Sequence, residues 1–356
     1  MKEVNIVLFG IGNVGKTLIG QLLAATEQWQ NEGVKLRIPV IANSTTALIA
    51  AEGISAEWNE DFGKNGKSYK VEDIVEFVSQ KRLKNLIAVD ATASKEFVEN
   101  YIDLVQNKFH LIAANKIANT LSADFYSQLR QELQKNERQF LYETNVGAGL
   151  PVVETLRNLH RSGEKVTKIR GVFSGSLSFI FNRFSEEGAV FSEVLEEAAK
   201  SGYTEPDARE DLSGNDVGRK LLILARELQL KKELSEVQIH SLIPSQLNGN
   251  TSAEEFKKRI SELDEIYEGH KNDQNEDHVL RYVGEIEVGS ASLEAKLISE
   301  PKTTALGQIK GADNIFEIYT ESYKDQPLVI QGAGAGAAVT ARGVVTDILK
   351  LSERLN

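Results

Sequence analysis

The chain opens on the stretch VNIVLFGIGNVG, which covers residues 4 to 15. Its first half, Val4–Phe9, is an apolar run with β-branched residues, typical of a strand buried on both faces of a parallel sheet. A GxGxxG pattern follows from Gly10 to Gly15, and apolar residues then recur at helical spacing over Lys16–Ala25. The order strand, glycine turn, helix predicts a dinucleotide-binding turn, although a plain tight turn between a strand and a helix is the alternative.

Each glycine of this turn has an expected physical role. Gly10 permits the tight turn, Gly12 lets backbone amides approach a pyrophosphate, and Gly15 lets the helix pack closely on the strand. Asn13 and Val14 lie within this turn and are also expected to contact the cofactor, and the N-terminus of the helix that follows supplies partial positive charge. We therefore expect Gly10–Gly15 to bind the phosphates of a dinucleotide.

Strands and helices keep alternating through the first half of the chain. The predicted strands are Leu36–Ala42, Leu86–Asp90, His110–Ala114 and Phe140–Tyr142. The predicted helices are Val71–Phe77, Glu96–Val105 and Ser122–Leu133. This alternation predicts an α/β fold with a Rossmann-type, doubly wound parallel sheet in residues 1–150.

A length of 356 residues predicts a second domain, which we place at residues 151–328. It should also be α/β. Its predicted helices are Val152–His160, Ser192–Lys200 and Ser252–Tyr267, and its predicted strands are Thr167–Phe173 and Leu280–Val288. The polar run His270–His278 is predicted to be a surface loop.

Composition narrows the classes of function. The net charge of −11 disfavours nucleic acid and acidic membranes as partners. No stretch approaches ~20 consecutive apolar residues, and nothing directs the chain out of the cytoplasm, so we expect a cytoplasmic protein that does not bind a membrane. The absence of cysteine excludes thioester-forming aldehyde dehydrogenases. Five scattered histidines without an HExxH pattern disfavour a zinc site.

The end of the second predicted strand bears on the choice of cofactor. An NAD-binding domain usually carries an acid there for the ribose 2′-hydroxyl, whereas this chain has Asn43 and Ser44. Because an acid would repel a 2′-phosphate, its absence favours NADP, with NAD still possible. The alternative is that a neighbouring group takes over the contact.

Three later segments carry more specific information. AANK, residues 113–116, puts Lys116 at the carboxyl end of a predicted strand, where open α/β sheets bind ligands. ETNVGAGLP, residues 143–151, is a glycine-rich turn that exposes carbonyls as well as amides. GYTEPDAREDLSGNDVGRK, residues 202–220, is an acidic loop that runs into an amphipathic helix and would suit a substrate with an ammonium group.

The last of these segments has a plain structural interpretation too. Asp216 lies where an N-cap is expected, and Lys220 follows four residues later on the same helix face. A cap with a solvated ion pair would contribute only ~0.3–0.5 kcal/mol. That interpretation leaves unexplained the four carboxylates that precede them, Glu205, Asp207, Glu210 and Asp211.

These segments resemble the signature of the homoserine dehydrogenase family, and VIQGAGAGAAVTA, residues 329–341, resembles that family's return to the cofactor domain. The resemblance implies that residues 329–356 complete the first domain. It also implies interconversion of aspartate 4-semialdehyde and homoserine with a nicotinamide cofactor. Lys220 would then be the general acid/base, assisted by Lys116 and oriented by Asp216. Asp216 and Lys116 would both contact the substrate as well. Glu205 would hold the substrate amino group, and Asp211 belongs to the same substrate loop.

Further positions follow from the resemblance. Thr92, Ser94, Asn115, Lys116 and Gly332 match positions near the cofactor. A monovalent cation, Na⁺ or K⁺, would be bound mostly by backbone oxygens of Glu143, Val146, Ala148 and Leu150. Family members form homodimers through the second domain. Neither a fused aspartate kinase nor a regulatory extension is expected here, which leaves feedback control by threonine in doubt.

Two other classes of function compete with this interpretation. One is a different Rossmann enzyme, such as a methyltransferase or a dehydrogenase for another amino-acid-derived alcohol. The other is a non-catalytic protein that senses NADP. Paired lysines and the acidic loop disfavour both, because neither a sensor nor a methyltransferase needs them.

Overall fold

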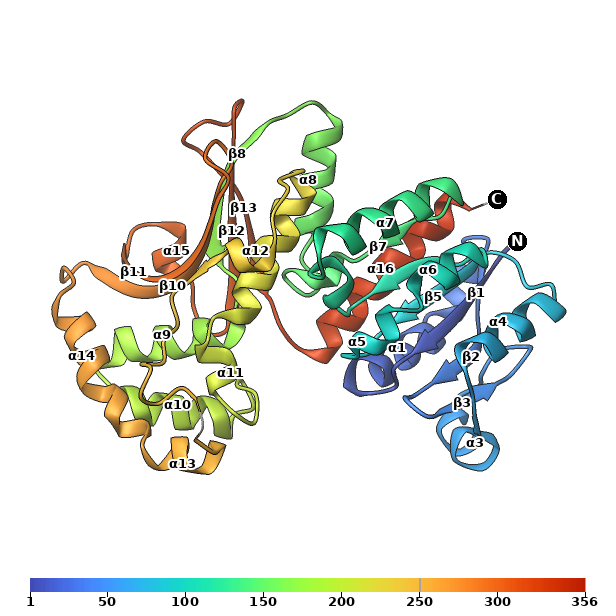
Figure 1. Ribbon diagram of the computed structural model, residues 1–356, viewed down its shortest axis with the longest axis horizontal. Coiled ribbons are helices and arrows are strands. Elements are labelled where there is room, and N and C mark those ends of the chain that lie inside the picture. The colour runs from blue at the N-terminus through green and yellow to red at the C-terminus, as the bar shows by residue number, and fades with distance from the viewer. Residues whose placement is uncertain (250, 356) are drawn as a thin grey trace. The chain divides into compact units, whose positions relative to one another are not determined.

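The computed structural model describes residues 1–249 and 251–355. The chain divides into two compact units. The first consists of Met1–Gly149 with Gly336–Asn356, and the second of Leu150–Ala335. Each unit is built on one sheet, coloured along the chain in Figure 1. Within the described residues, the helices are too short or too polar to cross a lipid bilayer.

The first unit contains a seven-stranded sheet in the order β4-β3-β2-β1-β5-β6-β7. The central neighbours are parallel, whereas β3 and β4 are added antiparallel at one edge. The strands are β1 (Lys2–Phe9), β2 (Val34–Ala42), β3 (Thr46–Ile49), β4 (Lys67–Ser68), β5 (Leu86–Asp90), β6 (His110–Ala113) and β7 (Phe140–Leu141). This confirms the predicted α/β fold class with a doubly wound, Rossmann-type sheet.

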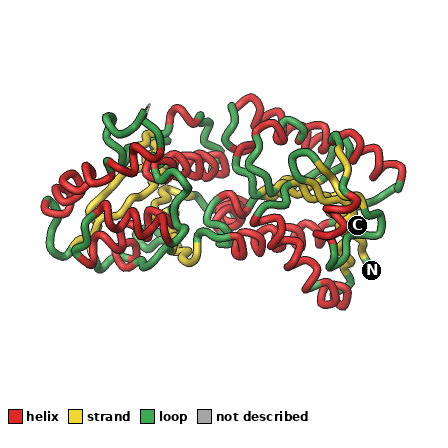
Figure 2. Tube along the Cα trace, turned by 90° about the horizontal axis from the view of Figure 1, so that it is seen from below, coloured by secondary structure: helices red, strands yellow, loops and turns green. Residues whose placement is uncertain are grey.

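Helices lie on both sides of these strands (Figure 2). They are α1 (Asn13–Ala24), α2 (Thr26–Asn31), α3 (Trp58–Asn65), α4 (Val71–Gln80), α5 (Lys95–Val98), α6 (Tyr101–Gln106), α7 (Ala123–Lys135) and α16 (Ala337–Arg354). The C-terminal α16 packs against α1, and its buried Val344, Ile348 and Leu351 share a core with Leu18 and Ile19 of α1. The end of the chain therefore stabilises the helix that follows the glycine turn.

The second unit contains a six-stranded sheet in the order β13-β12-β8-β10-β11-β9. Its neighbours are antiparallel except for β9 and β11. The strands are β8 (Val166–Val172), β9 (Gln238–Ile239), β10 (His278–Glu287), β11 (Ser292–Pro301), β12 (Asp313–Thr320) and β13 (Leu328–Ala333). The helices are α8 (Val152–Arg161), α9 (Gly175–Glu187), α10 (Phe191–Lys200), α11 (Arg209–Leu212), α12 (Asn215–Glu227), α13 (Ala253–Lys258), α14 (Asp264–Asn272) and α15 (Ala305–Gln308).

Helices α9 and α12 pack on this sheet and carry the side chains that matter below. Gly284 of β10 lets α12 and the Phe173 ring approach the sheet, because a Cβ there would lie 3.1 Å from Leu221 of α12 and 3.2 Å from that ring. The rings of Phe181 in α9, Phe191 in α10 and Tyr267 in α14 contact one another, and those of Phe191 and Tyr267 are stacked. This cluster fixes α9 to α10 and α14.

Several predicted boundaries differ from the structure. The return to the first unit was placed at Val329, but that residue lies in β13, which pairs with β12, so the returning segment begins at Gly336. The predicted helix Glu96–Val105 is two short helices, α5 and α6. The predicted helix Ser252–Tyr267 is interrupted by a 3₁₀ turn at Ile260–Leu263, and α14 extends into the run that was predicted to be a loop.

Candidate active site

The glycine turn after β1 has the geometry that a phosphate site needs. Gly10 has a φ of +97°, and a Cβ there would lie 2.6 Å from the backbone of Ala91. A Cβ on Gly15 would collide with the carbonyl oxygen of Gly10, whereas one on Gly12 would meet only open space. Gly10 and Gly15 are therefore required by the fold, while Gly12 leaves room at the start of α1 for a ligand.

The loop after β2 holds no carboxylate. Asn43 Oδ1 accepts hydrogen bonds from the amides of Thr45 (2.9 Å) and Thr46 (2.7 Å), and its carbonyl accepts one from the hydroxyl of Tyr69 (2.9 Å). Ser44 is exposed beside it. The loop after β2 therefore presents neutral groups at the position where other NAD-binding domains carry an acid, which would repel a 2′-phosphate.

The loops after β5 and β6 are joined by one buried acid that the sequence analysis did not identify. Asp90, the last residue of β5, accepts hydrogen bonds from the Thr92 amide (2.7 Å) and from Asn115 Nδ2 (3.0 Å). Asn115 Nδ2 also donates to the Ser94 carbonyl (3.0 Å). Lys116 directly follows Asn115 and caps the 3₁₀ turn Ile117–Asn119. Thr92, Ser94, Asn115 and Lys116 thus form one connected structure at the carboxyl ends of the strands.

The turn after β7 is buried and rich in backbone oxygens. Glu143 is 5% exposed, and its amide donates to Asp347 Oδ2 of α16 at 3.0 Å. Gly147 and Ala148 both have positive φ values, +78° and +52°. Val146 and Ala148 are buried, while Leu150 already belongs to the second unit. Clusters of three or more acidic, histidine or cysteine side chains suited to a metal are absent from the described residues.

This turn is chemically compatible with a hard cation, because it combines backbone carbonyls with oxygen-bearing side chains, among them the buried carboxylate of Glu143. The Thr144 hydroxyl is buried and has no hydrogen-bond partner within the described part of the chain. A multidentate site for zinc does not fit these residues.

In the second unit, Lys220 is the central charged group. It lies on α12 and is 7% exposed. Its Nζ donates to the Phe173 carbonyl at 2.6 Å and is 2.8 Å from Asp216 Oδ2. The interpretation as a solvated surface pair is therefore wrong for the lysine, although Asp216 is 45% exposed on its side chain.

The expected N-cap role of Asp216 is also wrong. Helix α12 begins at Asn215, and its N-cap is Gly214 with a φ of +74°. A Cβ on Gly214 would collide with the hydroxyl of Tyr282, so a side-chain cap is sterically excluded at that position. Asp216 is instead the second residue of the helix, one turn before Lys220, and its carboxylate is turned to the ammonium group.

The carbonyl that accepts from Lys220 has a second donor that the sequence analysis also missed. Asn314 Nδ2 of β12 donates to the Phe173 carbonyl at 3.1 Å, and Asn314 is fully buried. The chain packs tightly around this amide, because a Cβ on Gly334 would collide with it. Gly332, a predicted cofactor contact, pairs with Asn314 across β12 and β13. The glycine-rich segment is thus folded around the support of Lys220.

In the acidic loop, Asp211 and Asp207 are held by contacts within the protein, whereas Glu205 and Glu210 are exposed. Asp211 accepts from Ser176 Oγ (2.7 Å) and from the Glu205 amide (2.9 Å), and burial raises the pKa of its carboxyl group. Asp207 pairs with Arg209 at 2.6 Å. The side chain of Glu205 is exposed. Asp211 therefore fixes the backbone at Glu205, whose carboxylate is accessible to a ligand.

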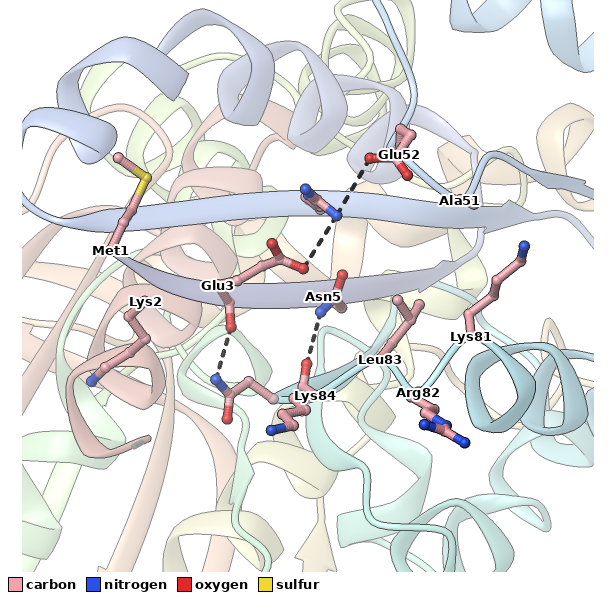
Figure 3. A pocket seen from close by; sticks show the side chains of 12 residues that line it. Met1, Lys2, Glu3, Asn5, Ala51, Glu52, Lys81, Arg82, Leu83 and Lys84 are labelled. Carbon is pink, nitrogen blue, oxygen red and sulfur yellow. Dashed lines mark hydrogen bonds and ion pairs between the residues drawn. The ribbon is translucent and has the colours of Figure 1, made fainter.

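A cavity at the opposite ends of the strands of the first sheet does not belong to this site. It has a volume of about 570 Å³ and lies at the amino-terminal ends of β1, β2 and β5 (Figure 3). Arg37 is paired there with Glu3 (3.2 Å) and Glu52 (3.6 Å). Arg37 is therefore already engaged with two acids of the protein.

Comparisons with known proteins agree with these observations. A family model described as homoserine dehydrogenase matches residues 151–349, and one described as the NAD binding domain of homoserine dehydrogenase matches residues 10–143. A homoserine dehydrogenase of Schizosaccharomyces pombe is 33% identical over 363 residues, which cover 99% of this chain and 96% of that protein. A chloroplastic bifunctional aspartokinase/homoserine dehydrogenase of Zea mays is 41% identical over 98% of this chain.

The chain spans only part of such bifunctional relatives, 38% of the length of the Zea mays protein. Among solved structures, a Candida auris protein of unknown function has a TM-score of 0.91 and 30% identity, with 100% of this chain and 99% of that chain covered. A hyperthermophilic archaeal homoserine dehydrogenase in complex with NADPH has a TM-score of 0.73 at 23% identity and shares the fold, with 99% of each chain covered. Matches of both family models and of a full-length relative establish that the chain belongs to the homoserine dehydrogenase family.

Proposed function

We propose that the protein is an NADP-dependent homoserine dehydrogenase, which interconverts aspartate 4-semialdehyde and homoserine in the aspartate pathway toward threonine, methionine and isoleucine. The observation that carries this proposal is the buried ammonium group of Lys220, held by the Phe173 carbonyl and Asp216. A buried lysine beside an acidic loop supplies a proton donor next to a place for an ammonium-bearing substrate. The family membership supports the same reaction.

Most of the proposed chemistry is carried by side chains of the second unit. Lys220 gives a proton to the carbonyl oxygen of the aldehyde and takes it back when homoserine is oxidised. Its two acceptors, at 2.6 and 2.8 Å, orient the ammonium group and limit its rotation. Glu205, which is exposed, binds the amino group of the substrate, and Asp211 holds the backbone that carries it. Lys116 of the first unit assists the proton transfer.

The groups that we propose to bind the cofactor come mainly from the first unit. When bound, NADPH supplies the hydride that the aldehyde carbon receives. Gly10–Gly15 and the start of α1 hold the phosphates, Asn43 and Ser44 lie at the ribose, and Thr92, Ser94 and Asn115 contact the cofactor, with Gly332 contributed by β13. Preference for NADP is supported by the lack of an acid after β2 and by the NADPH complex of the archaeal relative. The ratio of kcat/KM for NADPH over NADH should exceed one, and a ratio well below one contradicts this preference.

We also propose that a monovalent cation, Na⁺ or K⁺, binds the buried turn that contains Glu143, Val146 and Ala148, with Leu150 as the last ligand. The backbone oxygens and the single carboxylate support this. Activity after exhaustive dialysis into a buffer with a bulky organic cation should fall, and NaCl or KCl should restore it. Full activity without either salt contradicts the site.

Homodimers are proposed to form through the second unit. The sheet face that α9 and α12 leave uncovered carries paired charges, such as Arg170 with Glu317 (2.7 Å) and Lys168 with Glu287 (2.6 Å). Charges that are already paired are cheaper to bury in an isologous contact. Light scattering should give about twice the chain mass of 39.3 kDa. We further propose a cytoplasmic location, with small metabolites rather than nucleic acid or membranes as partners.

The decisive assay follows NADPH absorbance with aspartate 4-semialdehyde. Consumption of NADPH that depends on the aldehyde, with homoserine as the product, is the expected result. A protein that senses NADP would bind NADPH without turnover. A dehydrogenase for another amino-acid-derived alcohol would leave NADPH unchanged until its own substrate was supplied.

A further inference from the structure

Asp90 is a buried acid that the proposed chemistry does not use. It ends β5, is 2% exposed, and accepts hydrogen bonds from three residues, Thr92, Tyr101 and Asn115. Oδ1 accepts from the Thr92 amide (2.7 Å), and Oδ2 accepts from the Tyr101 hydroxyl (2.7 Å) and from Asn115 Nδ2 (3.0 Å). In the described part of the chain these donors are all uncharged. The carboxylate therefore joins three segments without forming an ion pair.

Two of the three segments that Asp90 joins, the loops of Thr92–Ser94 and Asn115–Lys116, are predicted to contact the cofactor, and the third is α6, which carries Tyr101. Asn115 connects Asp90 to two further backbone positions. Its Nδ2 also donates to the Ser94 carbonyl (3.0 Å), and its Oδ1 accepts from the Ile117 amide (3.0 Å). The residues on both sides of Lys116 are thereby fixed. One acid thus sets the positions of two loops at once.

Asp90 also holds the loop against which the glycine turn packs. A Cβ on Gly10 would lie 2.6 Å from the Ala91 backbone and 2.8 Å from the Thr92 amide nitrogen, so the loop after β5 lies directly on the turn. The Thr92 amide is the group that Asp90 Oδ1 holds. A shift of this loop would therefore alter the surface against which the glycine turn is packed.

A purely structural role would be the simpler explanation, but it fits the energetics poorly. Burial raises the pKa of Asp90, which means that the fold disfavours the charged form. Ionisation then lowers the stability of the folded state as the pH rises through that pKa. The charge is thus better explained by what it holds in place than by stabilisation of the fold.

We propose that Asp90 is a positioning residue, whose carboxylate holds the Thr92–Ser94 loop and the Asn115–Lys116 loop in the arrangement that binds NADPH. This inference rests on the proposed function for the identity of the cofactor. Asp90 itself has no role in proton transfer. Its effect passes through the Thr92 amide and the Asn115 side chain.

The Asp90→Asn variant tests the proposal. An amide has one accepting end, so in either orientation its NH₂ group faces an N–H donor, that of Thr92 or that of Asn115. We expect the Kd for NADPH, measured by cofactor fluorescence, to rise about 10- to 100-fold, because hydrogen bonds to a charged group are lost. The KM for NADPH should rise in parallel, while the KM for the aldehyde stays within about 3-fold. The midpoint of thermal unfolding should not fall below that of the control described next.

Tyr101→Phe is the matched control. It removes one hydrogen bond from the same carboxylate but leaves those of Thr92 and Asn115. Tyr101 packs edge-on against Phe140 with a ring separation of 5.7 Å, and phenylalanine keeps that contact. The Kd for NADPH should therefore stay within about 3-fold of the wild type. A network that only stabilised the fold would respond alike to both variants.

The outcomes separate this proposal from the proposed function. If the wild-type protein binds NADPH but does not reduce aspartate 4-semialdehyde, the proposed function fails while the binding comparison still tests Asp90. A Kd for Asp90→Asn within about 3-fold of the wild type overturns the positioning role. If Asp90→Asn does not fold, Asp90→Ser, whose hydroxyl can rotate to accept, replaces it. Failure of both variants to fold also overturns the proposal, because the acid would then serve the fold.

Discussion

Replacement of Lys220 by methionine separates the catalytic from the structural interpretation of the buried lysine. Methionine keeps the length and apolar stem of the side chain but removes the ammonium group. The proton at the reacting oxygen then has no donor on α12, so kcat should fall by about 10²- to 10⁴-fold. That loss corresponds to about 3–5 kcal/mol of transition-state stabilisation.

The structure predicts that Lys220→Met folds normally. The Phe173 carbonyl keeps its bond from Asn314 Nδ2 (3.1 Å), so no buried acceptor is stranded. Asp216 is 45% exposed on its side chain and stays hydrated without its partner. Because removal of a buried charge also relieves a desolvation penalty, the free energy of unfolding should change by no more than about 1 kcal/mol.

Steady-state kinetics in both directions and urea unfolding provide the measurement. Aldehyde reduction and homoserine oxidation should fall by the same factor in kcat/KM, because the variant cannot change the equilibrium constant. Arg219→Met, an exposed neighbour on the same helix, is the control and should retain full activity. A folded Lys220→Met variant with activity within about 10-fold of the wild type would refute the assignment of Lys220 as the proton donor.

Three further predictions follow from local geometry. Gly10→Ala should lower the free energy of unfolding by more than about 2 kcal/mol, because Gly10 has a φ of +97° and its Cβ position lies 2.6 Å from the Ala91 backbone. Gly12→Ala should leave that free energy unchanged and raise the KM for NADPH, because its Cβ would meet only open space. Similar midpoints of urea unfolding for the two variants would contradict this expectation. Burial lowers the pKa of His110 from 6.5 to about 4, so its contribution to stability is present above pH 6.5 and is lost as the pH falls toward 4. In urea unfolding, His110→Asn should reduce the decrease in the free energy of unfolding between pH 6.5 and pH 4 by up to about 3 kcal/mol. The same dependence of that free energy on pH in the variant and the wild type would contradict this expectation. Asp211→Asn should loosen the backbone at Glu205 and raise the KM for the aldehyde about 10-fold, while equal changes in the KM for NADPH would show a general loss of structure.

Much of the first unit is predictable from sequence because buried parallel strands are continuous apolar runs. Strand β5 matches its predicted bounds, Leu86–Asp90, for that reason. The boundary near Val329 was predicted wrongly because an apolar run followed by alternating glycines resembles the strand and glycine turn at the start of the first unit. In the structure that strand is the edge of the other sheet, and its alternating exposure reflects that place. Pairing partners far apart in the chain decide such a boundary.

The site was predictable only where its residues cluster in sequence. Lys220 and Asp216 stand in one acidic motif, but the burial of the lysine depends on Phe173 and on Asn314, which are 141 residues apart. Asp90 looks like the polar end of an ordinary strand, and its partner Asn115 is 25 residues away. Single polar residues of this kind leave no local pattern. Only the folded chain shows which donors they hold.

The most direct test of the account is the transfer of isotope from cofactor to product. NADPH deuterated at C4 of the nicotinamide, prepared as each stereoisomer, is incubated with aspartate 4-semialdehyde, and the product is analysed by mass spectrometry. The account predicts homoserine that carries deuterium at C4 from one of the two isomers, formed rapidly by the wild type and at most at about one hundredth of that rate by Lys220→Met. Unlabelled homoserine from both isomers, no homoserine at all, or equal rates for the two proteins would contradict it.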